Sequence, residues 1–143
     1  MTCLNTPFVS GYYGCDSAVA SRLIAGKDQL RPIKIRGDRL GESIILWEER
    51  YWAYKYASGC PGIKNPCVLG VFFELGNFLN LIEPVSNLTV TKENRVDLHK
   101  LFDTVLCTFI EGKPFFDRWD FNSGQYNQIR IYNPEQIKGY FRA

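Results

Sequence analysis

Hydrophobic and polar positions along the chain follow two periodic patterns, one typical of strands and one typical of helices. Short apolar or alternating runs between glycine, proline and asparagine predict strands. The predicted strands are residues 8–13, 44–47, 68–75, 78–82, 104–110 and 128–132. Three longer segments place apolar residues on one face of a helix. The predicted helices are residues 17–25, 48–58 and 92–102.

Helix ends and turns have their own residue patterns. Asp16 is a good N-cap for the first helix, and Gly26 stands where a glycine commonly ends one. The second helix ends at Gly59, with Pro61 just beyond it. Between the strands 68–75 and 78–82, the pair Gly76-Asn77 predicts a hairpin.

The order of these elements predicts the fold class. A strand, a helix, a loop, a strand and a helix are followed mostly by strands, which favours an α+β domain with antiparallel pairing over a doubly wound parallel sheet. The 143 residues suit a single domain spanning 1–143. Neither common glycine-rich phosphate loop is present, so a nucleotide would not bind in the Rossmann or Walker manner.

Composition narrows the function classes. A hydrophobic fraction of 45% is typical of a globular protein, and a net charge of +2 gives little reason to expect nucleic acid or membrane partners. No apolar run reaches the roughly 18 residues of a membrane span. The N-terminal residues lack a signal-peptide pattern, and the five cysteines are an odd number. We therefore expect reduced thiols in a cytoplasmic protein and, with one histidine, no metal site.

Three segments carry candidate chemistry. They are Gly11-Tyr12-Tyr13-Gly14-Cys15-Asp16, Leu40-Gly41-Glu42-Ser43-Ile44-Ile45-Leu46-Trp47-Glu48, and the stretch from Asn127 to Phe141. In order and spacing they resemble the ADP-ribosyltransferase fold of the poly(ADP-ribose) polymerase and diphtheria-toxin type. The resemblance implies mostly antiparallel split sheets with two to three flanking helices, and NAD as the substrate held between them.

The first segment resembles the strand that carries a His-Gly pair in that family. There the histidine holds the adenosine ribose, and the glycine backbone receives the nicotinamide amide. Here Gly14 is kept and Tyr13 replaces the histidine. A phenol can also hydrogen-bond a ribose, although an aromatic ring packed in the core is the alternative. Arg31, in Leu30-Arg31-Pro32, matches the donor loop that follows.

The second segment resembles the strand whose tyrosine stacks on nicotinamide. Ile45 stands at that position and has no π face for stacking. The family places a second stacking tyrosine on the following helix, which Tyr54 or Tyr56 could match. The alternative is that these aromatic residues pack the helix on the sheet.

The third segment resembles the strand that carries the catalytic glutamate. Gln128 stands there, and its amide can hydrogen-bond but has no charge to oppose a developing cation and cannot act as a general base. Losing one such electrostatic group typically lowers the rate by about 100- to 1,000-fold. Glu111, at the end of the preceding strand, is the acid that could substitute.

The similarity is greater to a group of small bacterial, toxin-like mono-ADP-ribosyltransferases. Shared sequences include Phe102-Asp103-Thr104-Val105, Phe109-Ile110-Glu111-Gly112 and Ile137-Lys138-Gly139-Tyr140-Phe141. That group already has glutamine at the position of Gln128. Tyr13 and Ile45 are therefore the positions at which this chain differs most clearly from the group's pattern.

Three functional hypotheses follow. The first is a degenerate ADP-ribosyltransferase-fold protein, a pseudoenzyme that binds or regulates through the former NAD cleft and has a protein partner there. The second is an active, divergent mono-ADP-ribosyltransferase that transfers ADP-ribose from NAD to a macromolecule. The third, weaker one is a nucleic-acid binder that uses the basic residues between Arg31 and Arg39.

Overall fold

The computed structural model describes residues 8–34, 41–80, 98–110, 113–114 and 125–143. Within these residues, eight strands form one sheet, and two longer helices pack on it. The strands are β1 (Phe8–Asp16), β2 (Ile44–Trp47), β3 (Pro66–Glu74), β4 (Phe78–Asn80), β5 (Thr104–Ile110), β6 (Lys113–Pro114), β7 (Gln125–Ile131) and β8 (Ile137–Arg142). The helices are α1 (Ser17–Ile24), α2 (Arg50–Gly59) and the short α4 (Leu98–Leu101).

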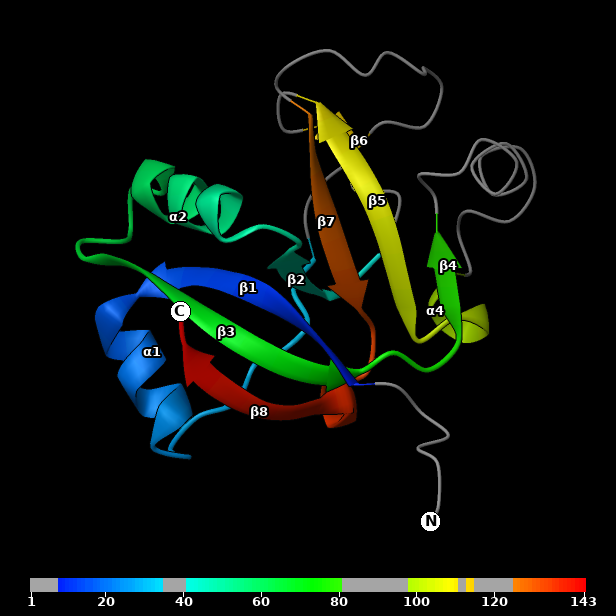
Figure 1. Ribbon diagram of the computed structural model, residues 1–143, viewed down its shortest axis with the longest axis horizontal. Coiled ribbons are helices and arrows are strands. Elements are labelled where there is room, and N and C mark those ends of the chain that lie inside the picture. The colour runs from blue at the N-terminus through cyan, green and yellow to red at the C-terminus, as the bar shows by residue number, and fades with distance from the viewer. Residues whose placement is uncertain (1–7, 35–40, 81–97, 111–112, 115–124) are drawn as a thin grey trace.

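The sheet consists of two halves that meet at one point. Its strand order is β4-β5-β7-β2-β1-β3-β8, with β6 beside β5 (Figure 1). Between β1 and β2 the register holds one pair, Tyr12 opposite Trp47. One half is therefore β8-β3-β1 and the other is β2-β7-β5-β4. In the described part of the sheet, β4 and β5 form the parallel pair and the other pairs are antiparallel, which confirms the predicted α+β class.

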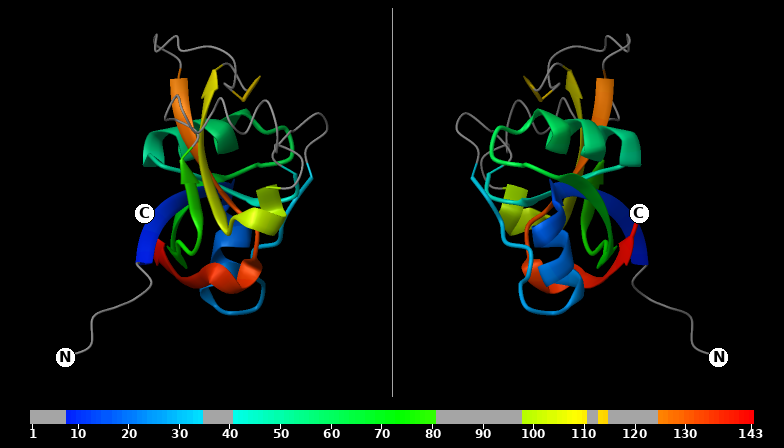
Figure 2. Two further views of the ribbon diagram at one scale, coloured as in Figure 1. Left: turned by 90° about the vertical axis from the view of Figure 1, so that its right-hand side faces the viewer. Right: turned by 90° about the vertical axis from the view of Figure 1, so that its left-hand side faces the viewer.

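The two longer helices cover opposite faces of the half that contains β1 and β3. Both side views show α2 above these strands and α1 below them (Figure 2). The larger core lies on the α1 side, and its sheet residues alternate along the strands. They are Cys15, Leu69, Val71, Phe73, Ile44, Leu46, Ile129 and Ile131. A smaller cluster of Trp47, Ala53 and Val68 lies on the α2 side.

The first helix begins where the sequence predicts. The Asp16 side chain accepts a hydrogen bond from the Ala18 backbone N–H at 3.0 Å, and the helix starts at Ser17. The same carboxylate accepts from the backbone N–H groups of Lys64 and Asn65, at 3.0 and 3.1 Å. Asp16 therefore ends β1, caps α1 and holds the 64–65 segment against both.

The predicted hairpin at Gly76-Asn77 is wrong. The chain does turn there, with Gly76 at φ 62°, but β4 pairs in parallel with β5 instead of returning along β3. The Asp103 carboxylate accepts from the Asn77 backbone N–H at 2.8 Å, and the Asp103 N–H donates to the Asn77 carbonyl at 2.8 Å. These bonds direct the chain to the start of β5.

Buried polar side chains connect the two halves at the end of β3. Gln136 donates to the Glu74 carbonyl and to the Thr104 hydroxyl, both at 2.9 Å. The Thr104 hydroxyl donates to the Leu75 carbonyl at 2.7 Å. Because Glu74 belongs to β3 and Thr104 to β5, this network joins the halves at a distance from the β1–β2 junction. Among the described helices, none is long and apolar enough to cross a membrane.

Candidate binding pocket between the two half-sheets

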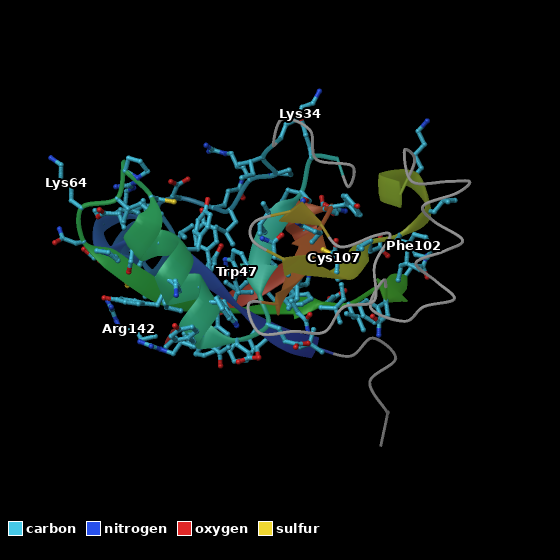
Figure 3. The ribbon with its side chains drawn as sticks, turned by 90° about the horizontal axis from the view of Figure 1, so that it is seen from above. Lys34, Trp47, Lys64, Phe102, Cys107 and Arg142 are labelled. Carbon is cyan, nitrogen blue, oxygen red and sulfur yellow. The ribbon has the colours of Figure 1, made fainter. Side chains whose placement is uncertain are left out.

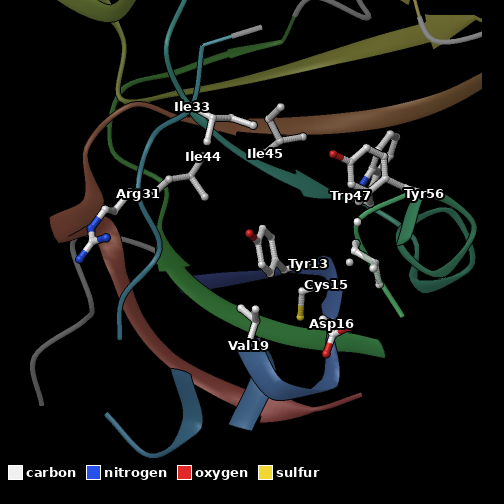
Figure 4. A pocket seen from close by; sticks show the side chains of 13 residues that line it. Tyr13, Cys15, Asp16, Val19, Arg31, Ile33, Ile44, Ile45, Trp47 and Tyr56 are labelled. Carbon is white, nitrogen blue, oxygen red and sulfur yellow. The ribbon is translucent and has the colours of Figure 1, made fainter. Parts of the chain in front are cut away.

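A pocket of about 300 Å³ opens where β1 and β2 separate. If the register at Tyr12 and Trp47 continued, the end of β1 would lie opposite the start of β2. Instead the strands part, and residues of both face the space between them (Figure 4). We call this space the β1–β2 pocket. Its lining residues are Tyr13, Gly14, Cys15, Asp16, Val19, Arg31, Ile33, Ile44, Ile45, Trp47, Tyr56, Gly62 and Ile63.

The walls of the pocket are largely aliphatic and aromatic. Ile33 is placed by two backbone hydrogen bonds with Ser43, at 2.9 and 3.1 Å, which hold the loop segment beside β2. The Trp47 and Tyr56 rings pack together with centroids 5.6 Å apart and planes tilted by 41°. In Figure 4 the Tyr13 phenol lies in the middle of the pocket, with Trp47 and Tyr56 on one side and Arg31 on the other.

Four of the residues predicted to contact a cofactor line this one pocket: Tyr13, Gly14, Arg31 and Ile45. They come from β1, the loop after α1, and β2, so the fold brings together segments far apart in the sequence. Tyr54 is not among the lining residues described, whereas Tyr56, the other tyrosine that the pattern offered, is. The two side chains are two positions apart on α2, which places them on different sides of the helix.

Gly14 has a packing role as well as a place in the pocket. A Cβ atom at this position would collide with the carbonyl oxygen of Ala53 in α2. The glycine therefore permits the helix to lie directly on β1. Its presence in the sequence is explained by this close approach, whether or not its backbone also receives a ligand.

Gln128 lies one strand away from the pocket. It stands opposite Trp47 on β2, and 6% of its surface is exposed. Its Oε1 accepts a hydrogen bond from Arg130 Nε at 2.9 Å, and Arg130 Nη1 donates to the Ser43 hydroxyl at 3.2 Å. Arg130 itself is 1% exposed and stands opposite the pocket residue Ile45. The second predicted catalytic residue, Glu111, lies outside the described residues.

The polar groups of the pocket are held in defined protonation states. Burial raises the pKa of the Tyr13 phenol, and the nearby Cys15 and Asp28 raise it further. Burial and a hydrogen bond with Cys60 raise the pKa of Tyr56 to about 12, and burial raises the pKa of the Cys15 thiol to about 11. These groups are therefore neutral at physiological pH.

Two charged residues line the same pocket. Hydrogen bonds from the backbone N–H groups of Ala18, Asn65 and Lys64 lower the pKa of Asp16, so its carboxylate is ionised at neutral pH. Arg31 forms an ion pair with Asp28, with Nη2 3.7 Å from the carboxylate. In the part of the chain that the structure describes, no group of three or more metal-ligating side chains occurs.

Sequence reasoning missed Trp47, Cys15 and Asp16 as pocket residues. The alternation along β2 could have indicated Trp47, because it lies on the same side of the strand as Ile45. For Asp16 the sequence pattern indicated only a cap, and Cys15 was noted only within the segment that resembles the family's first strand. No protein-family model matches the chain, and no curated protein shows significant sequence similarity to it.

Proposed function

We propose that the protein is a catalytically degenerate form of the ADP-ribosyltransferase fold that acts by binding, and that the β1–β2 pocket holds an NAD-type nucleotide without cleaving it. The observation that supports this most directly is the meeting of Tyr13, Gly14, Arg31 and Ile45 around one pocket. These are the positions that the sequence resemblance assigns to nucleotide contacts.

The polar groups beside the pocket favour binding over cleavage. Breaking the bond between nicotinamide and ribose develops positive charge on the ribose, which an anionic side chain would stabilise. Gln128 carries no charge, and its Oε1 accepts a hydrogen bond from Arg130. The side chain at this strand position therefore supplies no anion to stabilise that charge.

The size of the pocket fits one end of a dinucleotide. Small-molecule pockets usually measure about 300 to 1,000 Å³, and this one is at the lower limit. That volume suits a nicotinamide ring with its ribose. In this arrangement the Tyr13 phenol would hydrogen-bond the nicotinamide ribose instead of the adenosine ribose that the resemblance assigns to its position, and Arg31 at the other side suits a phosphate.

Calorimetric titration with NAD, combined with an assay for released nicotinamide, tests this proposal. We expect binding without nicotinamide release. Replacing Tyr13 by phenylalanine should weaken binding by about 3- to 10-fold, which is the usual contribution of one hydrogen bond. Tyr54→Phe is the matched control, because Tyr54 is not among the described lining residues.

Two outcomes would contradict the proposal in different ways. Absence of binding at millimolar NAD would exclude the nucleotide and direct the search to a protein partner at the pocket. Release of nicotinamide, or NAD-dependent labelling of a target, would instead support the alternative, an active and divergent mono-ADP-ribosyltransferase.

A further inference from the structure

Three aromatic side chains surround one part of the β1–β2 pocket. The Trp47 and Tyr56 rings form one wall, 5.6 Å apart, and the Tyr13 ring faces the same space from β1 (Figure 4). The faces of aromatic rings carry partial negative charge and attract cations within about 6 Å. Several rings around one space are the arrangement that recognises quaternary ammonium groups.

A negative charge lies at the end of β1, the strand that carries Tyr13, and its sign would attract a cationic ligand. Asp16 is ionised, and three backbone N–H groups hold its carboxylate in place at the pocket. The Lys64 backbone belongs to this arrangement, but its side chain points away from the molecule (Figure 3). The positive Arg31 lies on the opposite side of the pocket and is paired with Asp28. The aromatic part of the pocket therefore has an anion beside it.

The surroundings of the rings strengthen this attraction. Ile33, Ile44 and Ile45 line the pocket and lower its polarity. Cation–π contacts are worth more where water is excluded. The raised pKa values of Tyr13 and Tyr56 keep both phenols neutral, so neither supplies a negative charge of its own. The selectivity must then come from the ring faces and from Asp16.

We infer that the β1–β2 pocket selects ligands with a quaternary nitrogen, such as an N-alkylpyridinium ring, and binds them between Tyr13, Trp47 and Tyr56 beside the carboxylate of Asp16. This inference rests on the proposed function, because it concerns the same pocket. It goes further by making the positive charge of the ring, not the nicotinamide amide, the feature that is recognised. An oxidised pyridinium nucleotide should therefore bind better than its reduced form, in which the nicotinamide ring carries no charge.

The test compares two ligands of the same shape that differ in charge. They are 1-methylnicotinamide, which is a cation, and 3-methylbenzamide, in which a carbon atom replaces the charged nitrogen. Calorimetric titration of each should give a dissociation constant about 3- to 30-fold lower for the cation, the range that cation–π contacts supply. Equal affinities would overturn the inference.

Two helix variants distinguish ring recognition from simple apolar contact. Tyr56→Leu keeps an apolar side chain but removes the π face, so it should lower the affinity ratio toward one. Tyr54→Leu is the control, because Tyr54 is 47% exposed against 46% for Tyr56 and is not among the described lining residues. An unchanged ratio in Tyr56→Leu would also overturn the inference.

A third variant tests the carboxylate. Asp16→Asn removes the charge and keeps one acceptor oxygen, which can still accept from Ala18, whereas its NH2 group cannot accept the bonds from Lys64 and Asn65. It should reduce the preference for the cation without abolishing it. The results separate the two proposals. If NAD binds but the matched ligands bind equally, the inference fails alone. If the cation is preferred but NAD does not bind, the proposed function fails and the inference stands. If none of the ligands binds, both are overturned.

Discussion

At the scale of single residues, the least expected feature is the buried polar row of Gln128, Arg130 and Ser43. The alternation of residues 128–132 predicted a strand with one polar and one apolar face. The apolar face, with Ile129 and Ile131, does lie in the core. Nothing in the sequence pattern indicates that the polar face is buried as well, because alternation normally means that one face meets water.

Removing the guanidinium should reveal how much this row contributes. In Arg130→Met, the Gln128 Oε1 and the Ser43 hydroxyl lose a donor inside the protein. We expect the free energy of unfolding to fall by about 2–4 kcal/mol, since buried polar groups are costly to leave unsatisfied. Chemical denaturation measures this. Arg22→Met, at an arginine whose side chain is 51% exposed, should change stability by less than about 0.5 kcal/mol. Similar losses in both variants would contradict the role of the row.

A second residue-scale prediction concerns Cys15, which is 3% exposed. Folding raises its pKa from 9.0 to about 11. Its contribution to stability is therefore complete below about pH 9 and is lost as the pH rises toward 11. Over that interval the wild-type protein should lose about 2 kcal/mol more than Cys15→Ala does, because the variant has no thiol to ionise. Tyr13 and Tyr56 titrate in both proteins, so the difference between them reports the thiol together with its effect on the pKa of Tyr13. Parallel stability curves from pH 9 to 11 would rule out the shift.

At the scale of elements, the sequence predicted those helix and strand boundaries that neighbouring residues determine. The Asp16 cap sets the start of α1, and the apolar runs gave the bounds of β2 and β5 as the structure has them. The partner of β4 could not be predicted, because Gly76-Asn77 specifies a turn but not the strand that receives the chain afterwards. That choice depends on Asp103, 26 residues further on.

The contact of α2 with β1 rests on Gly14. Replacing it by alanine would force a Cβ against the Ala53 carbonyl, so the helix would have to move away from the strand. We expect a loss of about 1–3 kcal/mol in unfolding free energy, the usual cost of overpacking. The control is Gly59→Ala at the end of the same helix, where an added Cβ meets nothing within 4 Å. It should be neutral or stabilising, because alanine favours helix more than glycine does. If Gly14→Ala were as stable as Gly59→Ala, the packing explanation would be wrong.

At the scale of the whole molecule, the candidate site could be predicted only in part. The resemblance of three separate segments brought Tyr13, Arg31 and Ile45 into one hypothesis, and the fold places them around one pocket. Trp47 and Tyr56 complete the pocket because β1 and β2 separate after a single pair. A strand separation of this kind depends on what packs against each half and leaves no local pattern in either strand.

The division of the sheet has a consequence for stability. The halves are joined by the Tyr12–Trp47 pair near the pocket and by the Gln136 and Thr104 hydrogen bonds at the other end of β1 and β3. A ligand in the β1–β2 pocket contacts both halves, so it should oppose their separation as well as global unfolding. At about 100 times its dissociation constant, a ligand specific for the native state adds roughly 2.7 kcal/mol, which should raise the melting temperature by several degrees.

Hydrogen exchange with and without saturating NAD tests whether the ligand stabilises both half-sheets, on either side of the β1–β2 separation. Amides that exchange only through global unfolding gain protection throughout the protein and therefore say nothing about location. The informative amides are those of β1 and β2 that exchange through local opening. We expect the amides of Tyr13 to Cys15 and of Ile44 to Leu46 to slow together, because closing the pocket requires both strands. Slowing confined to one strand, despite a higher melting temperature, would mean that NAD binds on one half alone and that the separation of the strands does not form its site.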